Sequence, residues 1–417
     1  MQIITLNEKD FTEFASNNKY RSYYQTTNYG NLSRDLGYET YYLGFLNNNS
    51  ELVGATLLLV KTILGKYKYG YAPRGFLMDY NNQDFVNDLS IKLRELLMKQ
   101  NFIFIKIDPL ITCTERDKKG KILSSNTNIN KYIEILTNAG FVHKGFNNNF
   151  ETLKPRWNAV LRLNKRGSAL YDEFSKDTRY KLRDAAKYGL KVLKGTKKDF
   201  DTFYNLVKDS PVKEKEYYEA YIRNFKEDFE YFLVYLDPSV TVVEVKNEYE
   251  EELRQNDEYN MTIASSYGKA DPALVNKKME SDKRLSSLKQ KLVESTNILK
   301  EYPYGIAIAA CAIVKYDNGI TFLVDGYDKR FSSYNANYLC KWGVILTNSK
   351  KDYNYINLNG ISGEFSEDGT YKGLNDAKLG FNATAIEFIG EFDFVINESM
   401  YKQLSNEKVQ DQIVGSM

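Results

Sequence analysis

The feature that most restricts the fold of this chain is an order of elements that occurs twice. The first copy has an aromatic strand, a hairpin, an amphipathic helix and a buried strand at residues 41–46, 52–63 with 67–71, 85–98 and 102–107. The second copy has the same order at residues 231–236, 306–315 with 320–325, 336–349 and 353–358. Short apolar runs predict strands, and apolar residues at steps of three and four predict helices. The pattern therefore predicts an α+β fold built from two copies of one unit.

The second copy contains an insertion that the first copy lacks. Residues 237–303 separate its first strand from its hairpin, and apolar residues at helical spacing lie on both sides of a break at 267–272. Pro272 suits the first turn of the second helix. Residues 244–258 are mainly acidic and residues 277–300 mainly basic, which predicts an antiparallel coiled-coil arm. A solvated spacer and an arm that touches a large partner both fit this pattern.

These patterns define a domain plan for the 417 residues. We expect one unit at residues 1–155 and a second unit at residues 156–394. The arm occupies residues 240–302 within the second unit. Residues 395–417 are expected to pack back on the first unit.

Charge and composition exclude several classes of protein. Lys and Arg total 57 against 55 Asp and Glu, so the net charge of +2 excludes a uniformly basic nucleic-acid coat. A nucleic-acid partner would need a local basic patch. His143 is the only histidine, which excludes a His-rich metal site and disfavours a Ser–His or Cys–His nucleophile pair.

Cysteine usage and apolar runs indicate the compartment. Cys113, Cys311 and Cys340 lack CxxC spacing and predict reduced thiols of a cytosolic protein. The first residues lack the pattern of a signal peptide. The longest apolar run, at residues 305–314, is shorter than the roughly 20 residues that span a bilayer. We therefore expect a soluble protein that could still work at a membrane surface.

Two basic features are candidates for binding anions. Arg179, Arg183 and Lys187 step by four within a basic run, so they share one helix face that suits phosphates. A solvated helix face explains the same spacing. Arg74 lies between Pro73 and Gly75, where we expect Pro73 to fix φ and Gly75 to allow a positive φ. An arginine held in this way suits a carboxylate or a phosphate.

Two further residues are candidates for chemistry. Asp108 ends a strand before Pro109, which suits a general base, an orienting group or a simple turn cap. Lys378 lies between glycines in a turn-like run at residues 373–382. A lysine there could serve as a fixed cation or hydrogen-bond donor, or could be placed there by chance.

Four segments resemble a known family. No P-loop, GxGxxG or [QR]xxGx[GA] sequence is present, so the loop with which N-acetyltransferases bind CoA is missing. The chain instead resembles the Fem-type aminoacyltransferases, which build the interpeptide bridge of bacterial peptidoglycan. The segments are YAPRGFLMD at 71–79, IDP at 107–109, TRYKLRDAAKYGLKV at 178–192 and GLNDAKLGFNATAIEFIGEF at 373–392. The last is the most specific, and the resemblance spans nearly the whole chain.

The resemblance implies both a fold and an activity. The fold would be two tandem GNAT-like (N-acetyltransferase-like) domains with the coiled-coil arm inserted in the second. The activity would be transfer of Gly, Ala or Ser from aminoacyl-tRNA to an amine of a peptidoglycan precursor, either lipid II or UDP-MurNAc-pentapeptide. The enzyme would be cytoplasmic, with peripheral contact at the inner face of the membrane, and would need no cofactor and no metal. Two alternatives stay open: a tRNA- or CoA-dependent N-acyltransferase acting on another amine, and a non-catalytic cell-wall scaffold.

The resemblance also assigns roles to residues. The lysine that faces the reacting carbonyl falls on Lys378, beside Ala377 where the family usually has Phe. The candidate base falls on Asp108, with a carboxylate of the substrate as the alternative. The substrate-binding positions fall on Arg74, Lys213, Tyr217, Tyr327 and Arg34, and the tRNA-binding positions on Arg179, Arg183 and Lys187.

Two of these positions depart from the family pattern. Lys213 replaces an arginine, so it keeps the positive charge but lacks the planar guanidinium group. Arg34 stands next to Ser33, where the family has a phosphate-binding lysine, and Arg34 is expected to substitute for it.

Overall fold

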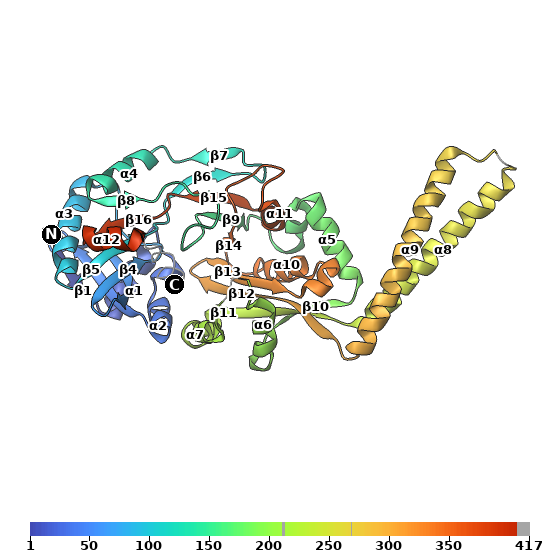
Figure 1. Ribbon diagram of the computed structural model, residues 1–417, viewed down its shortest axis with the longest axis horizontal. Coiled ribbons are helices and arrows are strands. Elements are labelled where there is room, and N and C mark those ends of the chain that lie inside the picture. The colour runs from blue at the N-terminus through green and yellow to red at the C-terminus, as the bar shows by residue number, and fades with distance from the viewer. Residues whose placement is uncertain (211–212, 268, 407–417) are drawn as a thin grey trace.

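The computed structural model describes residues 1–210, 213–267 and 269–406, and these residues form two mixed β-sheets (Figure 1). The first sheet has the strand order β1-β2-β3-β4-β5-β16-β8. Its strands are β1 (Gln2–Thr5), β2 (Glu39–Leu46), β3 (Leu52–Ile63), β4 (Tyr67–Ala72), β5 (Phe102–Ile107), β16 (Phe392–Val395) and β8 (Phe141–His143). The α-helices of this unit are α1 (Glu8–Asn17), α2 (Thr27–Asp35), α3 (Gln83–Met98), α4 (Ile129–Asn138) and α12 (Glu398–Asn406).

The second sheet has the strand order β10-β11-β12-β13-β14-β9-β15-β6-β7. Its strands are β10 (Leu190–Lys194), β11 (Phe229–Leu236), β12 (Ile306–Tyr316), β13 (Gly319–Tyr327), β14 (Tyr355–Gly360), β9 (Trp157–Arg162), β15 (Thr384–Phe388), β6 (Thr112–Arg116) and β7 (Ile122–Ser125). Its α-helices outside the arm are α5 (Lys176–Lys187), α6 (Phe200–Val207), α7 (Lys215–Phe225), α10 (Ala336–Asn348) and α11 (Lys372–Leu379).

Both units contain the predicted repeat. In the first unit, β3 and β4 form an antiparallel hairpin, α3 follows, and β5 lies parallel to β4. In the second unit, β12, β13, α10 and β14 have the same order and directions. The strands expected at residues 52–63 and 102–107 coincide with β3 and β5. The fold is therefore α+β with two tandem GNAT-like domains, as expected.

The run at residues 373–382, which the sequence suggested to be turn-like, is mostly helical. Helix α11 covers Lys372–Leu379, and its turns bury Asn375, Lys378 and Leu379. The side chain of Asn375 accepts a hydrogen bond from the main-chain N–H of Ser362 at 2.9 Å and donates one to the Ser362 carbonyl at 2.9 Å. This tertiary contact holds the short helix, which local sequence with two glycines did not predict.

The two sheets exchange strands across the expected domain boundaries. Strands β6 and β7, from the first part of the chain, pair with β15 and with each other in the second sheet. Strand β16 returns to the first sheet and pairs with β5 and β8. Helix α12 follows β16, and its Leu404 is buried with Tyr69 and Phe104 of the first unit. The boundaries at 155 and 394 stay predictions, and residues 407–417 lie outside the described residues.

One apolar cluster joins the two units. It contains Tyr29 and Leu57 of the first unit together with Phe203, Tyr221 and Leu233 of the second. Helices α2 and α7 pack together at this junction, where Asn224 Nδ2 donates to Asp35 Oδ2 at 2.8 Å. The shared core fixes the position of each unit relative to the other, and therefore fixes the cleft between them.

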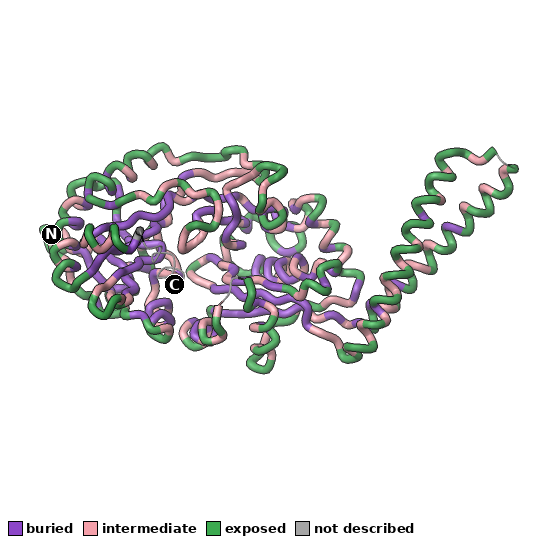
Figure 2. Tube along the Cα trace, viewed as in Figure 1, coloured by how far each residue is buried: buried purple, intermediate pink, exposed green. Residues whose placement is uncertain are grey.

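The insertion forms a helical hairpin that projects from the second unit (Figure 1). Its helices are α8 (Pro238–Ser265) and α9 (Pro272–Glu301), and their N-caps are Asp237 and Asp271, whose carboxylates accept from main-chain N–H groups. Proline occupies the first turn of each helix, as predicted for Pro272. Most of the arm is exposed (Figure 2).

The contact between the arm helices is partly polar. Asn256 is buried, and its Nδ2 donates to Ser281 Oγ at 3.0 Å across the hairpin. Arg284 pairs with Glu252 at 3.1 Å, as the opposite charges of the helices predicted. A buried polar pair between helices favours one register over others. Within the described part of the chain, we find no helix with the length and hydrophobicity that crossing a bilayer requires.

Candidate functional site

Strands β13 and β14 open a site where their pairing stops. They pair in parallel only over Gly319–Thr321 and Tyr355–Asn357 among the described residues. Lys378 of α11 reaches this opening, and its Nζ donates to the Gly360 carbonyl at the end of β14 at 2.8 Å. A cavity of about 1160 Å³ lies beside it, and its lining includes Lys378, Tyr327, Asp325, Lys341 and Asp209. The structure thus brings the predicted Lys378 and Tyr327 to one cavity.

The ammonium of Lys378 lies in an unusual electrostatic environment. Its residue is 7% exposed, and burial lowers its pKa to about 8, with nearby Asp325 raising it and Lys341 lowering it. Lys341 forms an ion pair with Asp325 in the cavity wall. Sequence reasoning missed both residues, because neither belongs to a recognisable motif. Gly360 occupies only one of the three donors of Lys378, so an oxygen in the cavity could accept another.

The corresponding position of the first unit is closed. There β4 leads to Arg74 and β5 leads to Asp108, and the main-chain N–H of Arg74 donates to Asp108 Oδ1 at 2.6 Å. Arg74 Nη1 lies 3.4 Å from Asp108 Oδ2. Two predicted site residues are therefore bonded to each other.

The positive φ expected at Gly75 lies at Arg74 instead. Arg74 has φ 57°, which turns its N–H toward Asp108. Gly75 is needed for space, because a Cβ there would lie 2.9 Å from Thr56 Oγ1. The expectation for Gly75 was wrong because the carboxylate that stabilises the turn is 34 residues away.

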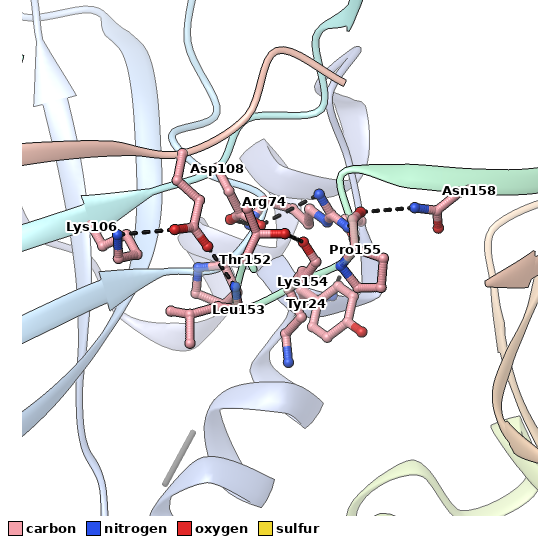
Figure 3. Close-up of polar contacts among 12 residues, drawn as sticks. Tyr24, Arg74, Lys106, Asp108, Thr152, Leu153, Lys154, Pro155 and Asn158 are labelled. Carbon is pink, nitrogen blue, oxygen red and sulfur yellow. Dashed lines mark hydrogen bonds and ion pairs between the residues drawn. The ribbon is translucent and has the colours of Figure 1, made fainter. Parts of the chain in front are cut away.

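The side chain of Arg74 holds the segment between the units (Figure 3). Its Nη2 donates to the Pro155 carbonyl at 2.9 Å, and its guanidinium lies 5.2 Å from the ring centroid of Phe388. Arg74 is 6% exposed. Much of the guanidinium group of Arg74 is thus already in contact with the protein itself. The assignment of Arg74 as a substrate-binding residue stays a prediction.

Asp108 is a buried carboxyl with an altered proton affinity. Burial raises its pKa to about 6, although Arg74 lowers it. Oδ1 accepts from Arg74, whereas Oδ2 has no hydrogen-bond partner among the described residues. The geometry provides one oxygen that could take a proton, and the base role stays a prediction.

A cluster of lysines and tyrosines lies where the two units meet. Lys213 Nζ lies 5.3 Å from the ring centroid of Tyr217, so this predicted pair is formed. Lys154 Nζ lies 4.9 Å from the ring centroid of Tyr24. Lys213 and Asp108 both affect the pKa of Lys154, which places the three groups near one another. Sequence reasoning missed Lys154 and Tyr24, since neither stands in a motif.

A second cavity of about 550 Å³ runs along the boundary between the units. Its lining includes Tyr24, Arg74, Asn158, Asn357 and Tyr355. Asn158 Nδ2 donates to the Pro155 carbonyl and its Oδ1 accepts from Asn357, so the amides of this wall satisfy one another. Arg74 therefore connects this groove with the Lys154 segment.

Arg34 lies apart from these groups. Its Nη2 donates to Glu8 Oε1 at 2.7 Å and to the Tyr42 hydroxyl at 3.2 Å. No described contact joins Arg34 to Lys213 or Lys378. The structure therefore does not bring Arg34 to the lysine cluster, because its place on α2 points it toward α1.

Helix α5 carries the predicted basic face. Arg183 is exposed, Arg179 Nη1 donates to the Asp172 carbonyl at 3.0 Å, and Lys187 pairs with Glu248 of the arm at 2.9 Å. The helix ends at Lys187, and Gly189 follows with φ 71°, a conformation common just after a helix end. Ser175, the N-cap of α5, donates its main-chain N–H to the Gly380 carbonyl at 2.8 Å, so α5 begins beside α11.

His143 and the cysteines lie outside these cavities. His143 Nε2 is 2.9 Å from the Ile389 carbonyl, and its ring lies between Phe146 and Phe392. The cysteines are buried, and the thiols of Cys311 and Cys340 lie 3.3 Å apart. Across residues 1–210, 213–267 and 269–406, no group of three His, Cys, Asp or Glu side chains could hold a metal ion.

This arrangement defines a class. Two GNAT-like units share a core, and a buried lysine stands at the opening of a parallel strand pair, so the chain is a protein of the tandem GNAT-like class. The model of the FemAB family matches residues 6–406. The chain belongs to the FemAB family, and it is an enzyme of the aminoacyltransferase type.

The similar proteins agree with this assignment. The chain is 25% identical over 410 residues to aminoacyltransferase FemA of Staphylococcus epidermidis, covering 96% of this chain and 97% of that protein. It is 25% identical over 423 residues to aminoacyltransferase FemA of Staphylococcus aureus, covering 99% and 100%. The crystal structure of FemX matches with a TM-score of 0.70 and 21% identity, covering 97% of this chain and all of that chain, which supports the fold.

Proposed function

We propose that this enzyme transfers a small amino acid, Gly, Ala or Ser, from aminoacyl-tRNA to an amine of a peptidoglycan precursor. The product would be an interpeptide bridge, or one step of it. The observation that carries this proposal is the ammonium of Lys378, which lies beside free space at the opening between β13 and β14. An aminoacyl ester is already activated, so the reaction needs positioning and charge stabilisation instead of a nucleophilic histidine.

In the proposed reaction, the acceptor nitrogen attacks the ester carbonyl of the aminoacyl group. An amide C–N bond forms, the ester C–O bond to the tRNA ribose breaks, and the ribose oxygen leaves with a proton as a hydroxyl group. The acceptor ammonium first gives one proton to a base, and after attack the nitrogen gives up a second proton that ends on the departing ribose oxygen, so the amide nitrogen keeps one hydrogen. Lys378 donates a hydrogen bond to the carbonyl oxygen as negative charge develops on it. The Asp325–Lys341 pair lies beside Lys378 in the same cavity and influences its charge.

Two groups are candidates for the base. Asp108 Oδ2 accepts no described hydrogen bond, although Arg74 Nη1 lies 3.4 Å from it, and a pKa of about 6 leaves the carboxylate charged at neutral pH. A carboxylate of the stem peptide is the alternative, because it would arrive with the acceptor. The variant Asp108→Asn distinguishes these two candidates for the base.

The acceptor is proposed to bind between the units. Lys213 and Tyr217 supply a cation and a ring there, and Tyr327 contacts the end near Lys378. Asp209 and Ser210 line the cavity of Lys378 and precede Lys213 by a few residues in the chain. An acceptor held at Lys213 could therefore extend its amine toward Lys378.

The donor is proposed to approach along α5. Arg179, Arg183 and Lys187 present a basic face on a helix that begins beside α11. Phosphates of a tRNA acceptor stem suit such a face. We propose that the enzyme works in the cytoplasm, with peripheral contact at the membrane when the acceptor is lipid-linked.

A transfer assay tests the proposal. The protein is mixed with tRNA charged with labelled Gly, Ala or Ser, and with either lipid II or UDP-MurNAc-pentapeptide. We expect label to move to one acceptor in the wild type and far less in Lys378→Met. Absence of transfer from all three charged tRNAs to both acceptors overturns the proposed function.

A further inference from the structure

Lys154, in the segment that joins the units, forms no ion pair among the described residues, although Asp108 is near enough to raise its pKa. No described carboxylate forms an ion pair with Lys154 or with Lys213. Lys154 instead lies over the ring of Tyr24, and Lys213 over the ring of Tyr217. A cation over an aromatic face is attracted to it, yet the ring does not neutralise its charge. Both ammonium groups therefore stay available to an anion.

An aromatic wall connects the two lysines across the boundary between the units. Each neighbouring pair of rings lies within about 6 Å of centroid separation, in the order Tyr24, Tyr23, Phe225, Tyr221 and Tyr217. The first two rings belong to the first unit and the other three to α7 of the second. The wall therefore runs continuously between the units, with one lysine over the ring at each end.

The segment that carries Lys154 is held by buried contacts. The main-chain N–H of Leu153 donates to Glu391 Oε1 at 2.6 Å, and Glu391 pairs with buried Lys106 at 3.0 Å. Thr152 Oγ1 donates to the Lys154 carbonyl at 2.8 Å. Arg74 holds the next residue through the Pro155 carbonyl, so anchors lie on both sides of Lys154 (Figure 3). A flexible surface lysine has no such support.

The electrostatics favour an anion at this place. Burial, with a smaller contribution from Lys213, lowers the pKa of Lys154 to about 8, while Asp108 acts in the opposite direction. Burial also lowers the pKa of Lys213, and Lys213 contributes to lowering the pKa of Lys61. Positive groups that destabilise one another without a bound partner are stabilised when an anion binds between them.

We propose that Lys154 binds the diphosphate of the acceptor substrate together with Lys213. The inference rests on the proposed function, since a diphosphate is the group that lipid II and UDP-MurNAc-pentapeptide share. Each of the two separate ammonium groups can donate a hydrogen bond to one phosphate. As compact charges, they do not need the planar, two-pronged geometry of a guanidinium group. Lys154 is thus a substrate-binding residue, and Glu391 is a positioning residue that acts through Leu153.

Equilibrium binding to the intact protein tests Lys154. The ligands are UDP-MurNAc-pentapeptide, lipid II in detergent, and MurNAc-pentapeptide without phosphate, and the readout is the calorimetric Kd. We expect Lys154→Met to weaken binding of at least one diphosphate ligand by about 10- to 100-fold, the range for a lost charged hydrogen bond. Binding of the phosphate-free ligand should stay unchanged. Lys154→Arg keeps the charge and should restore most of the affinity.

The control is Lys131→Met, which removes an exposed lysine from α4 in the first unit. Equal losses for ligands with and without phosphate overturn the assignment, as does unchanged diphosphate binding or its absence in the wild type. A folded Lys154→Met protein, checked by its Tm, separates lost binding from lost structure. Diphosphate binding that depends on Lys154 without any aminoacyl transfer would overturn the proposed function and leave Lys154 assigned. Aminoacyl transfer together with diphosphate binding that does not depend on Lys154 would support the proposed function and overturn the assignment of Lys154.

Discussion

The main-chain N–H of Arg74 donates to Asp108 Oδ1 at 2.6 Å, and this bond joins the ends of two parallel strands. In the described part of the second unit, the same pair of strands has no such carboxylate bridge; Asn359 Nδ2 donates to the Leu323 carbonyl at 3.4 Å, and Lys378 bonds to the end of β14. The two copies of one fold therefore use one position in different ways. The first unit closes this position and holds the segment between the units. The second unit leaves room there for a reacting group.

Lys378→Met should reduce turnover by about 10²-fold or more, because one donor to a developing oxyanion is removed. The free energy of unfolding should change little relative to this loss. Label transfer under saturating substrates measures the effect. Lys372→Met is a matched control in the same helix, since Lys372 pairs with Glu367 and Asp376 at the surface. Near wild-type turnover of Lys378→Met would remove Lys378 from the mechanism.

The pH dependence of turnover should have a falling limb near pH 8. Burial lowers the pKa of Lys378 to about 8, so its ammonium is present below that pH and is lost as pH rises through it. Only the ammonium is charged to stabilise an oxyanion. Measurement of kcat from about pH 6 to about pH 10 should show this limb. Lys378→Arg keeps a cation over this pH range and should lack the falling limb. A falling limb that persists in that variant would be assigned to another group.

Asp108→Asn should separate a base from an orienting group. Burial raises the pKa of Asp108 to about 6, so its carboxylate forms as pH rises through that value. If it takes the proton, kcat/KM of the wild type should rise with an apparent pKa near 6, and the variant should lose about 10²-fold. The asparagine oxygen can still accept from Arg74. A variant that keeps wild-type turnover would assign the proton to a carboxylate of the substrate.

Arg183→Glu should weaken the use of charged tRNA. Arg183 is exposed on α5, so its reversal should raise KM for aminoacyl-tRNA about 10-fold and reduce the slope of log KM against log salt by about one. The acceptor KM should not change. Lys131→Glu on α4 makes the same change of charge on a helix of the first unit. Equal effects of the two variants would show a general charge effect and contradict a tRNA site on α5.

Lys106→Met should destabilise the protein by about 3–5 kcal/mol, because it leaves buried carboxylates without a cation. Burial lowers the pKa of Lys106, but Asp393 and Glu391 raise it above its ordinary value. Their carboxylate oxygens lie 2.7 and 3.0 Å from Lys106 Nζ. Chemical denaturation measures the free energy of unfolding. Lys92→Met, which breaks an exposed pair with Glu95, should cost less than about 1 kcal/mol. Similar losses in both variants would contradict the structural role of Lys106.

Local residue patterns explain how much of the fold could be predicted. Strands β3 and β5 begin and end where their apolar runs do. The arm has its predicted Pro272 in the first turn of α9, because caps and prolines act within one turn of a helix. The motif around Lys378 marked a candidate site residue, but the helix that carries it is held by Asn375, which bonds to Ser362 outside the helix.

The sequence by itself determined the repeated α+β unit and the helical arm and marked Lys378 as a candidate, because these follow from periodicity and motifs along the chain. Only the tertiary structure decided that β6, β7 and β16 exchange between sheets and that Arg34 pairs with Glu8. It also decided that Arg74, and not Gly75, takes the positive φ, and that Lys154 comes to lie near Lys213. The physical reason is that these outcomes depend on partners far apart in the chain, whose contacts no local pattern records.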